Sequence, residues 1–149
     1  MALDQSFVGR SFPAGEPYVV GTEKVREFAA AIGDDNPISC SVAAAKVAGH
    51  DALVASPTFA IAAVARAQDV VVHDPALGLD FSRVVHGDQR FVHHRPIHAG
   101  DELHCTVIVD AIRALGSNDV LTLRAELSLA DGTPVTTATS SLVARGTAS

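Results

Sequence analysis

Side chains that could move protons are concentrated in one short stretch, AIGDDNPISCS, at residues 31–41. Asp34 offers a carboxylate and Asn36 an amide, and a positioned carboxylate is a common general acid or base. Gly33 is predicted to end a helix, and the Asn36-Pro37 pair favours an extended or turn conformation. The stretch is therefore predicted to be a tightly constrained loop that could hold the Asp34 carboxylate rigidly.

The same spacing is also typical of a loop with no chemical role. Asp34 and Asn36 could simply bond to the backbone of their own turn, and Ser41 could cap the helix that follows. Ser39 adds little catalytic power, because a serine hydroxyl without an adjacent base is too weak to remove a carbon-bound proton near neutral pH. From the spacing alone, both interpretations stay open.

Three helices are predicted in the first half of the chain, where apolar residues recur with helical spacing. The first covers about residues 22–32 and the second about 41–49, each with a glycine at its C-terminal end. The third is the central helix, at about residues 57–71, where Ser56 could act as the N-cap and Pro57 suits the first turn. Its first half is apolar on every side, which is typical of a buried helix.

The apolar residues alternate with a period of two in the second half of the chain, which is typical of strands. Four long strands are predicted, at residues 82–92, 102–112, 119–130 and 135–145. The turn-forming sequences LGSND and ADGTP separate the last three, which we expect to form an antiparallel meander. The expected fold is α+β, with a long antiparallel sheet wrapped around the central helix, the arrangement called a hotdog fold. A single domain over residues 1–149 is the expectation for this length.

The composition excludes several classes of function. With 17 acidic and 11 basic residues the net charge is −6, which argues against nucleic-acid binding. Neither a membrane span nor an N-terminal signal sequence is predicted. The two cysteines are far apart in the sequence, which predicts free thiols in a cytoplasmic protein. The seven histidines are scattered, so no metal site is predicted, and no cofactor is expected. The apolar fraction of 48% suggests that a partner subunit covers part of the surface.

The sequence GDDNPIS resembles the hydratase motif of the MaoC-like (R)-specific enoyl hydratases and dehydratases, Gly-Asp-x-Asn-Pro-(Leu/Ile)-His. The resemblance implies that Asp34 stands at the position of the catalytic aspartate and Asn36 at the position of the motif asparagine, whereas Ser39 replaces the histidine. In that family the aspartate and the histidine flank a water that adds to, or leaves from, the 2,3-double bond of an acyl thioester. A family glycine whose N–H binds the thioester carbonyl is replaced by Pro57, and the N–H of Thr58 could substitute.

A wider resemblance covers about residues 3–146. The segments FVGRSF, TEKVREFAAAIGDDNP, ASPTF and RVVHGDQRFVHHRPIHAGDEL are similar to the non-catalytic, substrate-binding subunit of actinobacterial heterodimeric (3R)-hydroxyacyl-ACP dehydratases, and to single-domain relatives of unassigned function. The resemblance implies a component for fatty-acid or polyketide biosynthesis that binds the acyl chain and needs a catalytic hotdog partner. The residues expected to line the acyl tunnel are Pro57, Thr58, Phe59 and Ile61.

Two alternatives remain open at this point. The protein could be a self-sufficient homodimeric hydratase in which His86 is the base, or a non-enzymatic protein that binds acyl thioesters. The densest basic stretch of the acidic chain could dock an anionic acyl carrier protein or coenzyme A, although it could equally be a solvated strand end. This stretch consists of Arg90, His93, His94 and Arg95.

Overall fold

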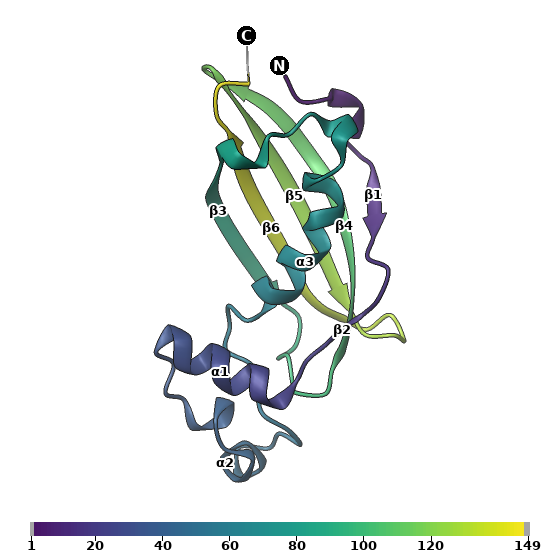
Figure 1. Ribbon diagram of the computed structural model, residues 1–149. Helices are drawn as coiled ribbons and strands as arrows, with labels where there is room; N and C mark the ends of the chain where they lie inside the picture. The colour runs from purple at the N-terminus through teal and green to yellow at the C-terminus, as the bar shows by residue number, and fades with distance from the viewer. Residues whose placement is uncertain (1, 148–149) are drawn as a thin grey trace.

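The computed structural model describes residues 2–147, in which one large sheet lies beside the helices (Figure 1). The helices are α1 (Thr22–Ile32), α2 (Val42–Val47) and α3 (Ala60–Val72), and short 3-10 turns lie at Gln5–Phe7, Pro37–Ser39, Pro75–Leu77 and Phe81–Arg83. The strands are β1 (Ser11–Pro13), β2 (Tyr18–Val19), β3 (Val84–His93), β4 (Glu102–Leu115), β5 (Asn118–Ser128) and β6 (Pro134–Ala144). Residues 1, 148 and 149 of the predicted domain lie outside the described residues.

The sheet is antiparallel, with strand order β1-β4-β5-β6-β3, and β2 pairs with β4. Strands β4, β5 and β6 form the predicted meander. In β5 the buried residues alternate with half-buried ones, so Leu121, Leu123 and Leu127 all face the core. A side-chain period of two places these leucines on one face, which explains why the alternation was visible in the sequence.

Helix α3 lies across one face of the curved sheet and contacts β4, β5 and β6 (Figure 1). The predicted wrapping of the sheet around this helix is confirmed, since Val64, Ala67 and Val71 are buried against the strands. The predicted burial on every side is wrong for the isolated chain, because the sheet covers only one side. Ala65, the last residue of the stretch that is apolar on every side, is exposed, and beyond that stretch Val70 is 53% exposed.

The start of α3 also differs from the prediction. The helix begins at Ala60, because residues 57–59 form a turn in which the amide of Phe59 donates to the carbonyl of Ser56 (2.9 Å). Ser56 does not cap the helix, since its side chain is used elsewhere. The sequence could not show that Asp34, rather than the end of the helix, binds the Ser56 hydroxyl, because Asp34 lies 22 residues away.

Helices α1 and α2 form a module at one end of the sheet (Figure 1). Helix α1 ends at Gly33, whose φ of 72° is the left-handed conformation that glycine adopts without strain. Ser41 caps α2 as predicted, accepting a hydrogen bond from the amide of Ala44 (3.2 Å). The loop between these helices, residues 33–41, contains the candidate motif and is therefore fixed at both ends.

Strand β3 is the last strand of the sheet and pairs only with β6. Its second edge carries backbone groups with no partner strand among residues 2–147. Val85 and Val92 on this strand are 45% and 40% exposed. Within the part of the chain that the structure describes, no helix is long and apolar enough to cross a membrane.

Candidate functional site

Asp34 follows α1 directly and is held by its own turn. Its amide donates to the carbonyl of Ala29 (2.8 Å), and its Oδ1 accepts from the amide of Asn36 (3.1 Å). Its Oδ2 accepts a 2.6 Å hydrogen bond from the hydroxyl of Ser56. The Ser56 hydroxyl and then the Asn36 amide lower the pKa of the Asp34 carboxyl, because both bonds favour the charged form. Asp34 is therefore an ionised carboxylate that links the motif loop to the turn before α3.

Asn36 and Ser39 are occupied by local contacts. The Oδ1 of Asn36 accepts from the amide of Ile38 (3.3 Å) and caps a 3-10 turn. Ser39 is only 2% exposed, and its hydroxyl donates to the carbonyl of Val54 (2.6 Å). At the position where the hydratase motif has its base, this chain thus has a buried hydroxyl that donates its hydrogen bond to a backbone carbonyl.

The turn at residues 56–59 separates the predicted tunnel residues. Pro57 and Thr58 are exposed and Ile61 is half-buried on α3. Phe59 is completely buried, and its ring lies edge to face against Phe28 (5.3 Å between centroids) and Tyr18 (6.3 Å). Phe59 therefore anchors the turn to α1 and β2, while Pro57 and Thr58 remain open to a ligand.

A cavity of about 420 Å³ lies beside this turn. One wall is residues 54–57 and the other is residues 93–97. It brings together residues that the sequence analysis assigned to different roles, namely Pro57 from the tunnel and His93, His94 and Arg95 from the docking stretch. Ser56, which the sequence suggested only as a helix cap, lines the same cavity and contacts Asp34.

His93 connects the two walls of the cavity. Its Nε2 lies 2.8 Å from the carbonyl oxygen of Pro57, and its Nδ1 lies 2.9 Å from the hydroxyl of Thr136 on β6. A carbonyl can only accept, so Nε2 must be the protonated nitrogen. In a neutral ring Nδ1 then accepts from Thr136, which is fully buried. Sequence reasoning missed Thr136, because no local pattern marks a partner 43 residues away.

The other docking residues are held to different degrees. Arg95 forms two hydrogen bonds to Asp101, at 2.7 and 3.1 Å, and this contact raises the pKa of Arg95. Burial favours the neutral form of Asp101, yet Arg95 and the amide of His98 together hold the pKa of Asp101 below its usual value. The Nε2 of His94 lies 3.0 Å from the hydroxyl of Thr137. Arg90 is exposed and makes no ion pair with another described residue.

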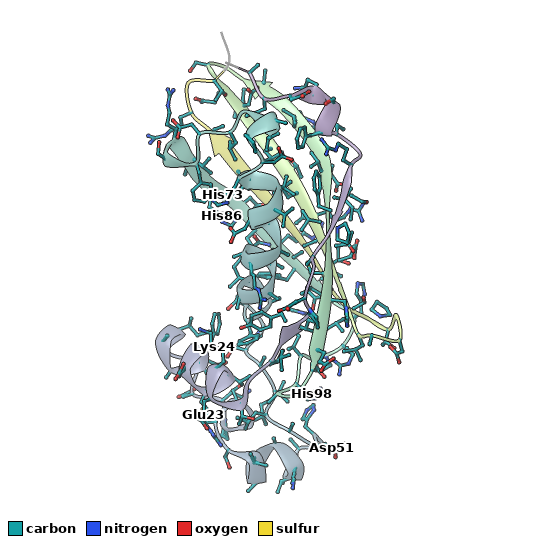
Figure 2. The ribbon with its side chains drawn as sticks, turned by 45° about the vertical axis from the view of Figure 1, so that its right-hand side comes forward. Glu23, Lys24, Asp51, His73, His86 and His98 are labelled. Atoms are coloured by element: carbon teal, nitrogen blue, oxygen red, sulfur yellow. The ribbon has the colours of Figure 1, made fainter. Side chains whose placement is uncertain are left out.

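His86 lies apart from this site. It is exposed on β3, and its Nε2 lies 3.1 Å from the carbonyl oxygen of Asp88, beside an irregularity in the strand pairing. Figure 2 places His86 alongside α3, away from the α1–α2 module that carries Asp34. Within one chain, His86 and Asp34 are not brought together. Among residues 2–147 there is also no cluster of three or more His, Cys, Asp or Glu residues arranged to hold a metal ion.

Comparisons with known proteins place this arrangement in a family. Residues 6–138 match the family model described as FAS1-like, dehydratase domain region. The chain is 56% identical to the UPF0336 protein of Saccharopolyspora erythraea over 148 residues, which cover 99% of this chain and 95% of that protein. Among solved structures it is similar to the HadBC (3R-hydroxyacyl-ACP dehydratase) complex of Mycobacterium tuberculosis, with a TM-score of 0.86 and 31% identity over 96% of this chain and 99% of the matched chain.

A second solved structure, a MaoC-like dehydratase, matches with a TM-score of 0.87 and 32% identity. The match covers 94% of this chain but only 42% of that longer chain. The family match spans most of the protein and agrees with the motif, the sheet and the central helix. The chain therefore belongs to the FAS1-like dehydratase family, within the MaoC-like hotdog superfamily of dehydratases and hydratases.

Proposed function

We propose that this protein is the acyl-binding component of a (3R)-hydroxyacyl-thioester dehydratase and that it needs a catalytic hotdog partner. The observation that carries the proposal is the contact of Ser39 with Val54. It leaves the motif with the ionised carboxylate of Asp34 and no imidazole. The proposed pathway is fatty-acid or polyketide biosynthesis, and free thiols at Cys40 and Cys105 are compatible with the predicted cytoplasmic location.

The chemistry explains why a partner is required. Dehydration of a 3-hydroxyacyl thioester removes a proton from C2, breaks the C3–O bond and releases the hydroxyl as water after it takes up a proton. The carboxylate of Asp34 could handle one of these protons, but one group cannot act as base and acid at two positions in one step. In the proposed complex the partner supplies an aspartate and histidine pair, and this chain contributes binding surface.

The free edge of β3 supports association with a second hotdog chain. The ten-residue strand pairs with β6 on one side, and its other edge has no partner strand among residues 2–147, with exposed Val85 and Val92 alongside. Such an edge is a ready template for pairing with another strand. The matched HadBC structure is a complex, which is what a two-chain enzyme of this kind would form. We propose that β3 pairs edge to edge with the corresponding strand of the partner.

The cavity between residues 54–57 and 93–97 is the proposed place for the thioester. Its lining joins apolar side chains with Ser56 and His93, and Thr58, the next residue after Pro57, is exposed. Arg90 lies on β3 and His94 directly follows this strand, and both are exposed. Both could contact the anionic carrier, either acyl carrier protein or coenzyme A. Arg95 is less available to contact the carrier, because its guanidinium forms an ion pair with Asp101.

A non-enzymatic acyl-thioester binder is the second candidate, favoured by the same closed contact of Ser39. The homodimeric hydratase with His86 as base has no such support within one chain, since His86 lies away from the Asp34 module. One assay separates the three possibilities. The purified protein is tested for hydration of crotonyl-CoA alone and together with a hotdog subunit that carries the intact motif.

The expected result is negligible activity alone and clear activity in the mixture, retained by Asp34→Asn in this chain. Activity of the protein alone that is lost in Asp34→Asn and in His86→Ala would establish the self-sufficient hydratase instead. Binding of acyl-CoA without activity in any mixture would favour the non-enzymatic binder. Failure to bind acyl-CoA or acyl carrier protein under all conditions would contradict the proposal altogether.

A further inference from the structure

A pair of histidines lies in a second cavity, on the other side of Arg95. The Nδ1 of His50 lies 2.9 Å from the Nε2 of His98, and the two ring centroids are 5.1 Å apart. Both side chains are half-buried. The surrounding cavity of about 400 Å³ is lined by residues 49–52 and by Arg95, His98, Ala99 and Asp101. Figure 2 shows His98 beside Asp51 at this end of the molecule.

The distance between the nitrogens limits the number of protons that the pair can carry. At 2.9 Å the two nitrogens share a hydrogen bond, which requires one of them to donate and the other to keep its lone pair. Two neutral rings satisfy this condition, and so does one neutral ring with one charged ring. Two charged rings cannot, because each nitrogen would then carry a hydrogen that points at the other. The contact therefore breaks when the second ring takes up a proton.

The charged groups around His98 come from both segments. Burial is the main factor that lowers the pKa of His98 below the ordinary value of about 6.5, and Arg95 and the His50 ring act in the same direction. Asp101 and Asp51 oppose them. Asp101 also accepts a 2.8 Å hydrogen bond from the amide of His98, so the loop carrying His98 is fixed to the Arg95–Asp101 ion pair.

The histidine pair joins two segments that frame the candidate site. His98 forms an isolated bridge with Val54, the residue that accepts the hydroxyl of Ser39. The amide of Ala55 donates to the carbonyl of Ile97 (2.8 Å), and the amide of Ala99 donates to the carbonyl of Leu53 (2.9 Å). Opening the histidine contact would therefore loosen the segment that positions both Ser39 and the cavity wall.

We propose that His50 and His98 form a proton-controlled clamp that is closed near neutral pH and opens in mild acid. In the closed state it holds residues 53–55 against residues 97–99 and keeps the wall of the candidate site in place. In the open state the second proton drives the rings apart, and the polar cavity between them widens. The consequence for thioester binding rests on the proposed function, whereas the clamp itself is a property of this chain.

The test measures amide hydrogen exchange in the full chain at Ala55 and Ala99, whose N–H groups bond across the two segments. Between about pH 7.5 and a pH below the lowered pKa of His98 we expect exchange, corrected for its intrinsic pH dependence, to accelerate about tenfold. His98→Asn removes the titrating ring and should abolish this step. Asp51→Asn removes a charge that favours protonation and should move the step to lower pH. His104→Asn, an exposed histidine on β4, is the matched control and should leave the step unchanged.

Histidine NMR titration of the unaltered protein gives a readout that does not depend on how the variants fold. We expect His98 to become charged only in the pH range where protection of Ala55 and Ala99 is lost. A step that persists in His98→Asn, or full protection while both rings are charged, would overturn the clamp. Acyl-CoA binding at the two pH values is measured in parallel. If no thioester binds at either pH while the exchange step remains, the proposed function fails and the clamp does not.

Discussion

The hydroxyl of Ser39 donates a 2.6 Å hydrogen bond to the carbonyl of Val54, across 15 residues of sequence. Ser39 is 2% exposed, so this contact is buried. The position at which the hydratase motif has its histidine has therefore become a structural link between the motif loop and the wall of the candidate site.

Restoring the histidine should not restore activity. Ser39→His places an imidazole ring where a small hydroxymethyl group is tightly buried. We expect the unfolding free energy to fall by about 1–3 kcal/mol, with no gain in crotonyl-CoA hydration. Ser39→Ala, which only removes the hydrogen bond to Val54, should cost about 1 kcal/mol. Urea unfolding and a hydratase assay measure both effects. A stable Ser39→His protein that hydrates crotonyl-CoA would contradict this interpretation of the loop.

Removing the Ser56 hydroxyl should raise the pKa of the Asp34 carboxyl, because that hydroxyl is the main factor that lowers it. A carboxyl with a lowered pKa in the folded chain adds stability above its unfolded pKa of about 3.9, and this is lost as the pH falls through the folded pKa. The destabilisation by Ser56→Ala should thus be greatest above about pH 4 and shrink below it. Carboxyl NMR titration and acid unfolding provide the measurements.

Ser41→Ala is the matched control for Ser56→Ala. It also removes a serine hydroxyl from this part of the chain, but that hydroxyl caps α2 by accepting from the amide of Ala44. The control should cost about 1 kcal/mol at all pH values. An equal pH dependence in both variants would mean that the Ser56 hydroxyl does not control the charge of Asp34.

His93→Ala should weaken both the fold and the binding of thioesters. The substitution removes the link between Pro57 and Thr136, and it leaves the buried Thr136 hydroxyl without this partner. We expect the unfolding free energy to fall by about 1–3 kcal/mol and the Kd for acyl-CoA to rise. His94→Ala, at an exposed neighbour, should change stability by less than about 0.5 kcal/mol. Equal effects of the two substitutions would remove His93 from the wall of the site.

A charge on the free edge of β3 should prevent association. Val85→Lys places an ammonium group on the strand that we propose to pair with the partner, and charged side chains on an edge oppose strand pairing. Sedimentation should show a dissociation constant raised at least about tenfold. Val47→Lys, on α2 where the side chain is 91% exposed, is the control and should not change association. Unchanged association of Val85→Lys would place the interface elsewhere.

Charge reversal separates the two arginines of the docking stretch. Arg90→Glu should weaken binding of an acyl carrier protein without loss of stability, because Arg90 is exposed and has no ion pair among the described residues. Arg95→Glu should lower stability as well, since it sets a second carboxylate against Asp101. Carrier binding is measured by titration calorimetry and stability by urea unfolding. Unchanged carrier affinity of Arg90→Glu would exclude this surface as the docking site.

The sequence alone determined the features that depend on local periodicity and turn chemistry. The alternating leucines of β5, the end of α1 at Gly33 and the cap of α2 at Ser41 all depend on residues within a few positions of one another. The motif with its missing histidine was equally visible. These features are predictable because backbone geometry and side-chain period act over one turn of helix or a few residues of strand.

The tertiary structure alone decided which groups meet. Ser56 binds Asp34 and so cannot cap α3, and His93 closes on Pro57 and Thr136 from 36 and 43 residues away. The same packing covers only one side of α3 and leaves Ala65 and Val70 exposed on the other. Hydrogen bonds and burial between distant residues depend on how the sheet curves around the helix. The wrapping itself was predicted, but no local pattern shows which distant groups it brings together, so the site became visible only in the folded chain.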